Sequence, residues 1–353
     1  MSFFASFFIY VASFALSIFC YNFSKRCTKR TRVFFIALAI VIPALMSAFR
    51  TSGTDLHAYI SIYERIHAGT LDASYEPLWV LLNAIAPTRE IWLFLSSVVF
   101  LTVSHLAIRR HGLKNCTLAY TIVLLVFFSV FFNIMRQMLA VAIIFYGYYY
   151  LERRRYLPYI LSVIVAMMFH KSAILMLALL LLKLVIRNDG AQGVKDRHMK
   201  VFSMIIFACA AVAPFVASPL FRLIAILTPF DQYVSGLAWN PDLEFLICML
   251  PPVVLFYLSG GHRGHSAHCN ELFLIYICCL PIQTLGFMAT YVNRMVYYFY
   301  FFVVALVPAI LDDLKGKRDC PKYQFIFWMW FLLYYVLVFA VFNTADAYPF
   351  IKS

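Results

Sequence analysis

Long apolar runs separated by short polar connections are the feature that most constrains how this chain can fold. The first run extends from Ser2 to Phe23 without a charged residue, and comparable runs recur along the sequence. A helix needs roughly 20 apolar residues to cross the hydrocarbon core of a bilayer. Hydrophobic residues fill 64% of the 353 positions and charged residues only 13%, whereas soluble domains carry about 25% charged residues. The sequence therefore predicts an all-α polytopic membrane protein.

We expect about twelve transmembrane helices in one integral membrane domain that covers residues 1–353. The sequence shows no Gly/Ser linker and no internal repeat that would divide it. The run from Ser2 to Phe23 lacks a basic segment before it and a small-residue cleavage site, which favours a retained first span over a signal peptide. The expected spans are 3–23, 33–49, 90–108, 116–132, 137–151, 157–169, 172–186, 200–217, 243–258, 271–290, 295–311 and 322–342.

Basic residues in the short loops indicate the orientation. Lys and Arg in such loops stay on the cytoplasmic side of the membrane, and alternating sides then places both termini on the outer, periplasmic face. The net charge of +13 is explained by this topology, so no nucleic-acid partner is expected. Most of the 29 Lys and Arg residues lie in SKRCTKRTR, RRHGLK, ERRRY, Lys183–Lys200, GGHRGH and DDLKGKRDCPK.

Cysteine placement agrees with an inner membrane. None of the nine cysteines falls in a predicted outer loop. Exposed thiols form disulfides in an oxidising compartment. Since the predicted outer loops contain no cysteine, no structural disulfide is expected.

Polar residues at the outer ends of the predicted spans are few and therefore informative. A charged side chain near the hydrocarbon costs about 3 kcal/mol or more unless it faces a cavity or a partner. Such residues predict a polar cavity that opens outward, with cations at its floor. They are Arg50 with Asp55, Arg136 with Gln137, His170 beside Lys171, and Arg294 beside Asn293.

The connection that carries Arg136 is very short. Only Asn133 to Gln137 is polar between two apolar runs, so this turn is expected to lie within the outer leaflet, where backbone groups need buried protein or water beside them. Two plainer interpretations stay open. Arg136 could extend to the lipid headgroups, and His170 could be a hydrogen-bonded packing residue.

Other motifs carry less information. The stretch GGHRGHSAHC offers His262, His265, His268 and Cys269, but their spacing matches no closed four-ligand zinc site. A Gly-rich cytoplasmic loop explains it, so no metal and no cofactor are expected. The sequence contains no GxSxG, HExxH or Walker motif.

Arginines and a histidine in an outward cavity suit one chemistry well. Arginine matches phosphate oxygens with a planar fork of donors, and a lipid pyrophosphate lies at the required depth. His170 or Asp55 could accept a hydroxyl proton. Together they predict glycosyl transfer from a polyprenyl pyrophosphate, with arginines stabilising the leaving pyrophosphate.

Four ordered patches of this sequence resemble the EpsG group of Wzy-type polysaccharide and O-antigen polymerases, and Tyr348-Pro349-Phe350 resembles the terminal Tyr-Pro feature of that group. One departure is Leu56, where an aromatic residue is expected after Asp55. The patches are Arg50-Thr-Ser-Gly53-Thr54-Asp55 with Tyr59, Arg136-Gln137 with Ala140, Phe169-His170 with Ser172 and Ala173, and Arg294 followed by Tyr297, Tyr298 and Pro308.

The resemblance implies a GT-C-like bacterial inner-membrane enzyme with a periplasmic active site. It would be a metal-independent glycosyltransferase of surface polysaccharide or lipopolysaccharide biosynthesis. The growing glycan would move from undecaprenyl pyrophosphate onto the non-reducing end of a new lipid-linked repeat unit. Expected partners are these lipid-linked repeat units, membrane lipids and a chain-length regulator protein.

The resemblance also suggests roles for individual residues. Arg136 and Arg294 would hold the donor pyrophosphate, and Arg50 would orient one of the two pyrophosphates. His170 would be the base, with Asp55 as its partner or rival. The remaining expected substrate-binding residues are Gln137, Tyr59 and Tyr297.

Two outer loops, near residues 50–89 and 218–242, are expected to supply specificity. The first contains YEPLWVLLNAI, an apolar piece too short to span the membrane and expected to be re-entrant or interfacial. The second mixes aromatic and carboxylate residues as sugar sites do, and an ordinary amphipathic loop explains it equally well. Its candidate residues are Asp231, Gln232, Tyr233 and Trp239.

Three alternative functions remain open. An O-antigen ligase uses the same lipid donor but usually has a larger outer domain. A lipid-linked oligosaccharide flippase also needs a cationic cavity, and typically has internal repeats. A proton-coupled transporter needs carboxylates within its spans, and nearly all carboxylates here lie in loops.

Overall fold

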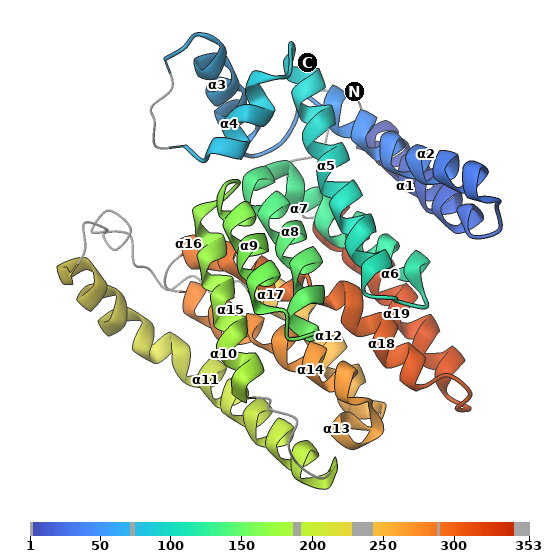
Figure 1. Ribbon diagram of the computed structural model, residues 1–353, viewed down its shortest axis with the longest axis vertical. Coiled ribbons are helices and arrows are strands. Elements are labelled where there is room, and N and C mark those ends of the chain that lie inside the picture. The colour runs from blue at the N-terminus through green and yellow to red at the C-terminus, as the bar shows by residue number, and fades with distance from the viewer. Residues whose placement is uncertain (1–2, 71–74, 186–191, 228–242, 288–289, 342–353) are drawn as a thin grey trace. The chain divides into compact units, whose positions relative to one another are not determined.

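The computed structural model describes residues 3–70, 75–185, 192–227, 243–287 and 290–341 (Figure 1). These residues form helices and connections, with no β-strand among them. The predicted all-α class is confirmed for this part of the chain. The terminal stretch Tyr348-Pro349-Phe350 and the loop candidates Asp231, Gln232, Tyr233 and Trp239 lie outside the described residues.

The chain divides into two compact units. Unit 1 comprises Met1–Leu177 with Phe325–Ser353, and unit 2 comprises Ala178–Gln324. The expectation of one membrane domain stays a prediction. Unit 1 contains α1 (Phe3–Ser24), α2 (Lys29–Phe49), α3 (Leu56–His67), α4 (Pro77–Ala84), α5 (Arg89–Arg110), α6 (Cys116–Ile122), η1 (Val123–Phe127), α7 (Phe128–Asn133), α8 (Met135–Glu152), α9 (Tyr156–Met167) and η2 (Lys171–Leu177).

The other helices belong to unit 2 or to the end of the chain. The boundary between the units falls within α19 (Cys320–Tyr334), after Gln324, so most of α19 and η5 (Tyr335–Val341) belong to unit 1. Unit 2 contains α10 (Ala178–Val185), α11 (Gln192–Leu227), α12 (Leu243–Leu258), α13 (Gly261–Gly264), α14 (Ala267–Ile277), α15 (Cys279–Gly286), α16 (Thr290–Asn293), η4 (Arg294–Val296), α17 (Tyr297–Tyr300) and α18 (Val303–Asp313).

Seven helical segments among the described residues are long and apolar enough to cross a membrane. They coincide with seven of the twelve predicted spans, so the protein is a polytopic membrane protein. The seven are Ala5–Ser24, Lys29–Phe49, Arg89–Arg110, Cys116–Asn133, Arg197–Val216, Ala267–Gly286 and Arg294–Asp313.

The other five predicted spans are also helical where they are described. The span predicted at 137–151 lies in α8, and those at 157–169 and 243–258 correspond to shorter apolar helices. The span at 172–186 is divided between η2 and α10, and that at 322–342 between α19 and η5. The total of twelve spans and the periplasmic placement of the termini stay predictions.

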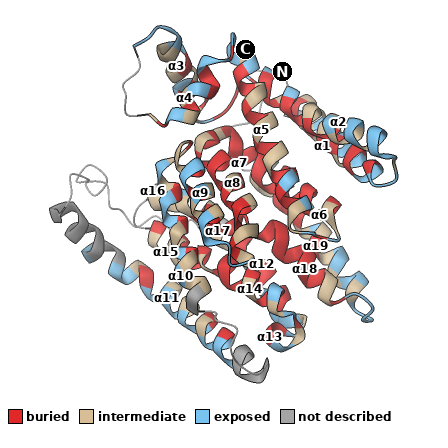
Figure 2. Ribbon diagram, in the orientation of Figure 1, coloured by how far each residue is buried: buried red, intermediate tan, exposed pale blue. Residues whose placement is uncertain are grey.

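Helix α8 is largely enclosed within unit 1 (Figure 2). It packs against α5 and α9, and its buried residues lie on every side, as in a helix that is surrounded by others. Gly147 allows α9 to approach closely, because a Cβ at this position would collide with Ser162. Small residues have this role where membrane helices pack together. The first turn of α8 is therefore held by a tightly packed helix.

The outer surfaces of several helices are apolar, as expected of surfaces in contact with lipid. In unit 1, Phe8 and Phe19 of α1 and Phe34 of α2 are more than half exposed. In unit 2, Phe215 of α11 is 80% exposed. Exposed apolar surface on this scale marks a membrane or protein contact.

The two predicted outer loops differ from simple loops in their described parts. The first contains α3 and α4, and α4 is the short apolar piece that cannot span the membrane. The second was expected from residue 218, but α11 continues to Leu227. Pro219 lies inside this helix, which shows that the proline did not end it as a loop signal would suggest.

Candidate functional site

The candidate site is built around the turn between α7 and α8. Only Ile134 separates the two helices, with φ −119° and ψ 49° outside the helical region. Arg136 therefore lies in the first turn of α8 and is one-quarter exposed, whereas the neighbouring Gln137 is buried. The expected short turn is present, and its depth in the outer leaflet stays a prediction.

Arg136 is paired with an acidic residue from the first outer loop. Its Nη1 donates a hydrogen bond to Glu76 Oε2 at 2.8 Å, and its guanidinium lies 5.4 Å from the ring centre of Tyr75. The Glu76 side chain is only 7% exposed. A carboxylate this buried needs a charged partner or several hydrogen bonds.

Glu76 also joins the turn that carries His170. The backbone N–H of Lys171 donates to Glu76 Oε1 at 3.3 Å. At the start of α4, the N–H groups of Leu78 and Trp79 donate to Met168 O at 2.9 and 3.4 Å. These bonds satisfy helix-terminal donors that have no partner within α4. Three segments distant in sequence therefore meet at Glu76: the first outer loop, the α7–α8 turn and the α9–η2 turn.

Arg50 reaches the same α7–α8 turn from the end of α2. Its Nη1 donates to Ser52 O at 3.0 Å and its Nη2 to Phe132 O at 3.1 Å. The guanidinium also lies 4.4 Å from the ring centre of Phe132. Nearby, the N–H of Thr54 donates to Asn133 Oδ1 at 3.2 Å. The loop after Arg50 is thus fastened to the turn that begins α8.

The charge of Arg50 is buried without a carboxylate. The residue is 3% exposed, and no ion pair to it occurs among the residues that the structure describes. Burial lowers the pKa of Arg50 to about 10, although Tyr10 and Tyr59 oppose the shift. This lowering corresponds to roughly 3 kcal/mol against the charged form. Arg50 still carries its charge near neutral pH.

Gly53 allows the loop to pack closely against the Arg50 guanidinium. Its φ is +143°, a conformation that residues with a Cβ rarely adopt. A Cβ at this position would also collide with Arg50 Nη1. The glycine is therefore required both by its backbone conformation and by the close approach of the guanidinium.

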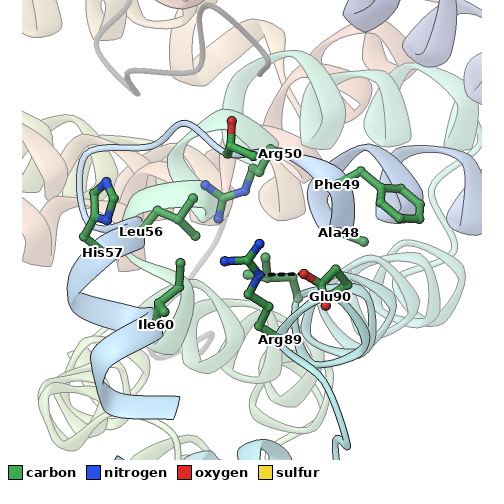
Figure 3. A pocket seen from close by; sticks show the side chains of 10 residues that line it. Ala48, Phe49, Arg50, Leu56, His57, Ile60, Arg89 and Glu90 are labelled. Atoms are coloured by element: carbon green, nitrogen blue, oxygen red, sulfur yellow. Dashed lines mark hydrogen bonds and ion pairs between the residues drawn. The ribbon is translucent and has the colours of Figure 1, made fainter. Parts of the chain in front are cut away.

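A pocket of about 270 Å³ adjoins Arg50 (Figure 3). Arg50 and Arg89 both extend into it, and Arg89 Nε pairs with Glu90 Oε1 at 2.6 Å. His57 and Leu56 of α3 line the opposite side. The pocket therefore combines Arg50 and the Arg89–Glu90 ion pair with an apolar wall, and Arg50 is the cation in it that has no carboxylate paired to it in the described residues.

The remaining predicted residues of unit 1 lie around this turn in different settings. His170 Nδ1 is 2.6 Å from Ser172 Oγ, and the residue is half-buried. Asp55 occupies the N-cap position of α3, next to the anchored Thr54. Tyr59 is 6% exposed, with its ring centre 5.6 Å from that of Trp79, which is a packing environment.

Arg294 and Tyr297 belong to unit 2. Arg294 begins η4 and is exposed, and Tyr297 begins α17 and is half-buried. Their expected place beside the donor stays a prediction.

Glu76 and Arg89 were not identified from the sequence. Both lie in the first outer segment, and Glu76 directly precedes Pro77 at the start of α4. An acidic residue next to a short apolar helix is the signal that could have identified Glu76, by the same argument used for Arg136.

The fold and this turn define a polytopic membrane protein with a cationic site between helix ends. Residues 33–352 match the EpsG family, and the chain belongs to this family. The match extends over nearly the whole chain and includes every residue of the four patches named above. Comparisons with curated proteins and with solved structures give no match. Membership of the EpsG family suggests a glycosyltransferase-like polysaccharide polymerase.

Proposed function

We propose that this protein is a surface polysaccharide polymerase of the bacterial inner membrane. It transfers a growing glycan from undecaprenyl pyrophosphate onto the non-reducing end of a new lipid-linked repeat unit, at the periplasmic face. The observation that carries the proposal is the buried charge of Arg50, which contacts two backbone carbonyls, the Met135 sulfur and an aromatic ring, with no carboxylate paired to it in the described part of the chain. Such a charge is destabilising unless an anion completes the site.

The pyrophosphate of a lipid carrier is the anion that fits this site. The second arginine, Arg136, lies in the same α7–α8 segment that Arg50 contacts. Two arginines are therefore associated with this one turn. Guanidinium groups bind phosphate oxygens in pairs of parallel hydrogen bonds. As the glycosidic bond to the donor breaks, negative charge grows on the pyrophosphate, and fixed cations stabilise this change. Arg294 of unit 2 is proposed as a third cation for the donor.

Glu76 controls the availability of Arg136 in this proposal. Its carboxylate holds Arg136 Nη1 at 2.8 Å and therefore competes with the donor for the guanidinium. When the pyrophosphate binds, it replaces Glu76 on one edge of the fork. Glu76 keeps its bond to the Lys171 N–H, so the α9–η2 turn remains attached.

His170 is proposed to accept the proton of the attacking hydroxyl group. Ser172 N–H donates to His170 Nδ1 at 3.4 Å, and Ser172 Oγ lies 2.6 Å from the same atom, so Nδ1 carries the lone pair that acts as the base in this proposal. The acceptor oxygen bonds to the anomeric carbon, the bond from that carbon to the pyrophosphate oxygen breaks, and the hydroxyl proton moves to His170. Asp55 would assist or replace His170, and the arginines supply the positive charge, so the transfer is proposed to be metal-independent.

The test is a gel of the surface polysaccharide from a strain that lacks this gene. A polymerase predicts a single band of core plus one repeat unit, because flipping and ligation continue without polymerisation. Loss of every band with long polymer left on the lipid carrier would instead identify a ligase. Loss with single units retained at the inner leaflet would identify a flippase. Purified protein with lipid-linked repeat units should make polymer without any other enzyme.

A further inference from the structure

Three residues with metal-binding side chains meet in unit 2. His265 follows α13, Cys269 lies in the first turn of α14, and Asp313 is the last residue of α18. Their candidate ligand atoms all lie within 4.8 Å of one another. His265 and Cys269 are buried and Asp313 is half-buried. The sequence offers His265 and Cys269 as ligand types, but nothing in it places Asp313 beside them.

The hydrogen bonds of His265 identify the nitrogen that faces this cluster. Ser259 Oγ donates to Phe256 O at 3.1 Å, so it accepts from His265 Nε2–H at 2.8 Å. The Nδ1 atom then carries a lone pair. It makes no hydrogen bond within the described part of the chain, although the side chain is fully buried.

A negative group lies opposite that lone pair. Asp313 Oδ2 is 3.4 Å from His265 Nδ1. A carboxylate oxygen and an imidazole lone pair repel each other unless a proton or a cation lies between them. In a tetrahedral zinc site, bonds of about 2.0–2.2 Å place neighbouring N and O ligand atoms about 3.4 Å apart. The distance between these two atoms is the one that a shared metal ion would require.

The residues around the cluster orient its ligands. The N–H of Ser266 donates to Asp313 Oδ2 at 2.7 Å, and Ser259 Oγ fixes the His265 ring. Asn270 Nδ2 donates to His265 O at 3.4 Å. Metal-binding histidines and carboxylates are usually held by such outer hydrogen bonds, which also raise the basicity of the ligand.

We propose that His265, Cys269 and Asp313 bind one zinc ion, with water as the fourth ligand. Imidazole, thiolate and carboxylate together suit zinc. Cys269 loses its S–H proton to solvent when the metal binds. The ion links the start of α14 to the end of α18, on the side predicted to be cytoplasmic, where thiols stay reduced. Its role is structural, and the glycosyl transfer proposed above does not depend on it.

The test uses the full-length protein, purified in detergent through a tag without histidine. After treatment with a chelator, the protein is titrated with Co²⁺. A thiolate ligand produces a sulfur-to-cobalt charge-transfer band, and a tetrahedral site produces strong visible bands. We expect both with wild type at one equivalent, together with displacement by Zn²⁺. Elemental analysis of untreated protein should give about one zinc per chain.

Two variants and one control locate the site. Cys269→Ser should abolish the charge-transfer band, and Asp313→Asn should weaken Co²⁺ binding by about 10-fold or more, since a charged ligand is lost. Cys116→Ser, which changes a thiol of unit 1, should behave as wild type. The wild-type spectrum decides the matter even if a variant fails to fold. Absence of the charge-transfer band, or its persistence in Cys269→Ser, would overturn the proposal and leave a proton-sharing cluster.

Discussion

Arg136 Nη1 and Glu76 Oε2 lie 2.8 Å apart, although 60 residues separate them in the sequence. This ion pair joins the first turn of α8 to the start of α4, and through the Lys171 N–H it extends to the α9–η2 turn. It occupies the arginine that the proposed donor needs. The pair therefore offers a way to separate structural from catalytic effects at the site.

Replacing Glu76 by glutamine should affect stability and donor binding in opposite directions. The neutral amide keeps the shape but loses the ion pair, so unfolding free energy should fall by about 1–3 kcal/mol. The Michaelis constant for the lipid-linked donor should fall several-fold, because no carboxylate competes for Arg136. Thermal unfolding in detergent and polymerisation kinetics measure the two effects.

Glu90→Gln is the matched control for stability. Its pair with Arg89 is exposed, with side-chain exposures of 38% and 54%, and exposed pairs contribute little. A higher Michaelis constant in Glu76→Gln would contradict competition between Glu76 and the donor.

Arg136→Lys should reduce polymerisation by about 10- to 100-fold and shorten the polymer. Lysine keeps the charge but loses the planar fork, and a hydrogen bond to a charged group contributes about 1.5–3 kcal/mol. Complementation of the gene deletion, followed by a gel of the polysaccharide, measures the effect. Arg155→Lys, at an exposed position in a predicted cytoplasmic loop, should restore wild-type polymer. Near-normal polymer from Arg136→Lys would remove Arg136 from the proposed mechanism.

Arg50→Met should abolish activity with little loss of stability. Replacing a buried charge with an apolar side chain of similar length is often neutral or stabilising. Here it also removes the free-energy cost of burying the guanidinium charge. We expect unfolding free energy to change by no more than about 1 kcal/mol while polymerisation falls more than about 100-fold. If the protein unfolds at a much lower temperature, Arg50 is a structural residue that holds the α7–α8 turn.

Gly53→Ala should impair activity through Arg50. The Cβ would collide with Arg50 Nη1 and also meet an unfavourable φ of +143°. Gly69→Ala isolates the backbone effect, because Gly69 has φ +69° and a Cβ added there would meet nothing within 4 Å. Gly69→Ala should lose about 1 kcal/mol of stability and Gly53→Ala about 1–3 kcal/mol, but only Gly53→Ala should lower polymerisation, by about 10-fold or more. Equal activities in the two variants would rule out the steric link to Arg50.

The pH dependence of kcat/KM should reveal Arg50 in the free enzyme. Its pKa is lowered by burial to about 10, so the guanidinium is charged below that pH and loses its proton above it. Donor capture should therefore decline as the pH approaches 10. In Arg50→Lys the decline should move to lower pH, because lysine has a lower ordinary pKa of about 10.4 and is subject to the same burial. An unchanged alkaline limb in Arg50→Lys would assign the decline to another group.

The sequence determined the class of the protein and most of its helices. Long apolar runs leave helices as the structure that satisfies backbone hydrogen bonds in lipid, so helical segments could be placed without tertiary information. The short turn at Arg136 followed from the same reasoning, since too few polar residues separate its two runs. Arg50 and His170 were selected as candidates because charged residues are rare on the less basic side.

Only the tertiary structure decided which residues meet. Glu76 was not selected from the sequence, because nothing local indicates that a carboxylate before a short apolar helix will reach Arg136. Among the described residues, the partners of Arg50 are two carbonyls, a methionine sulfur and a ring rather than a side chain of opposite charge, which no pattern of charges predicts. Asp313 likewise joins His265 and Cys269 only because α18 ends beside α14. Hydrophobic runs and charge patterns predict where single helices begin and end. A site, however, depends on contacts between helix ends that lie far apart in the chain.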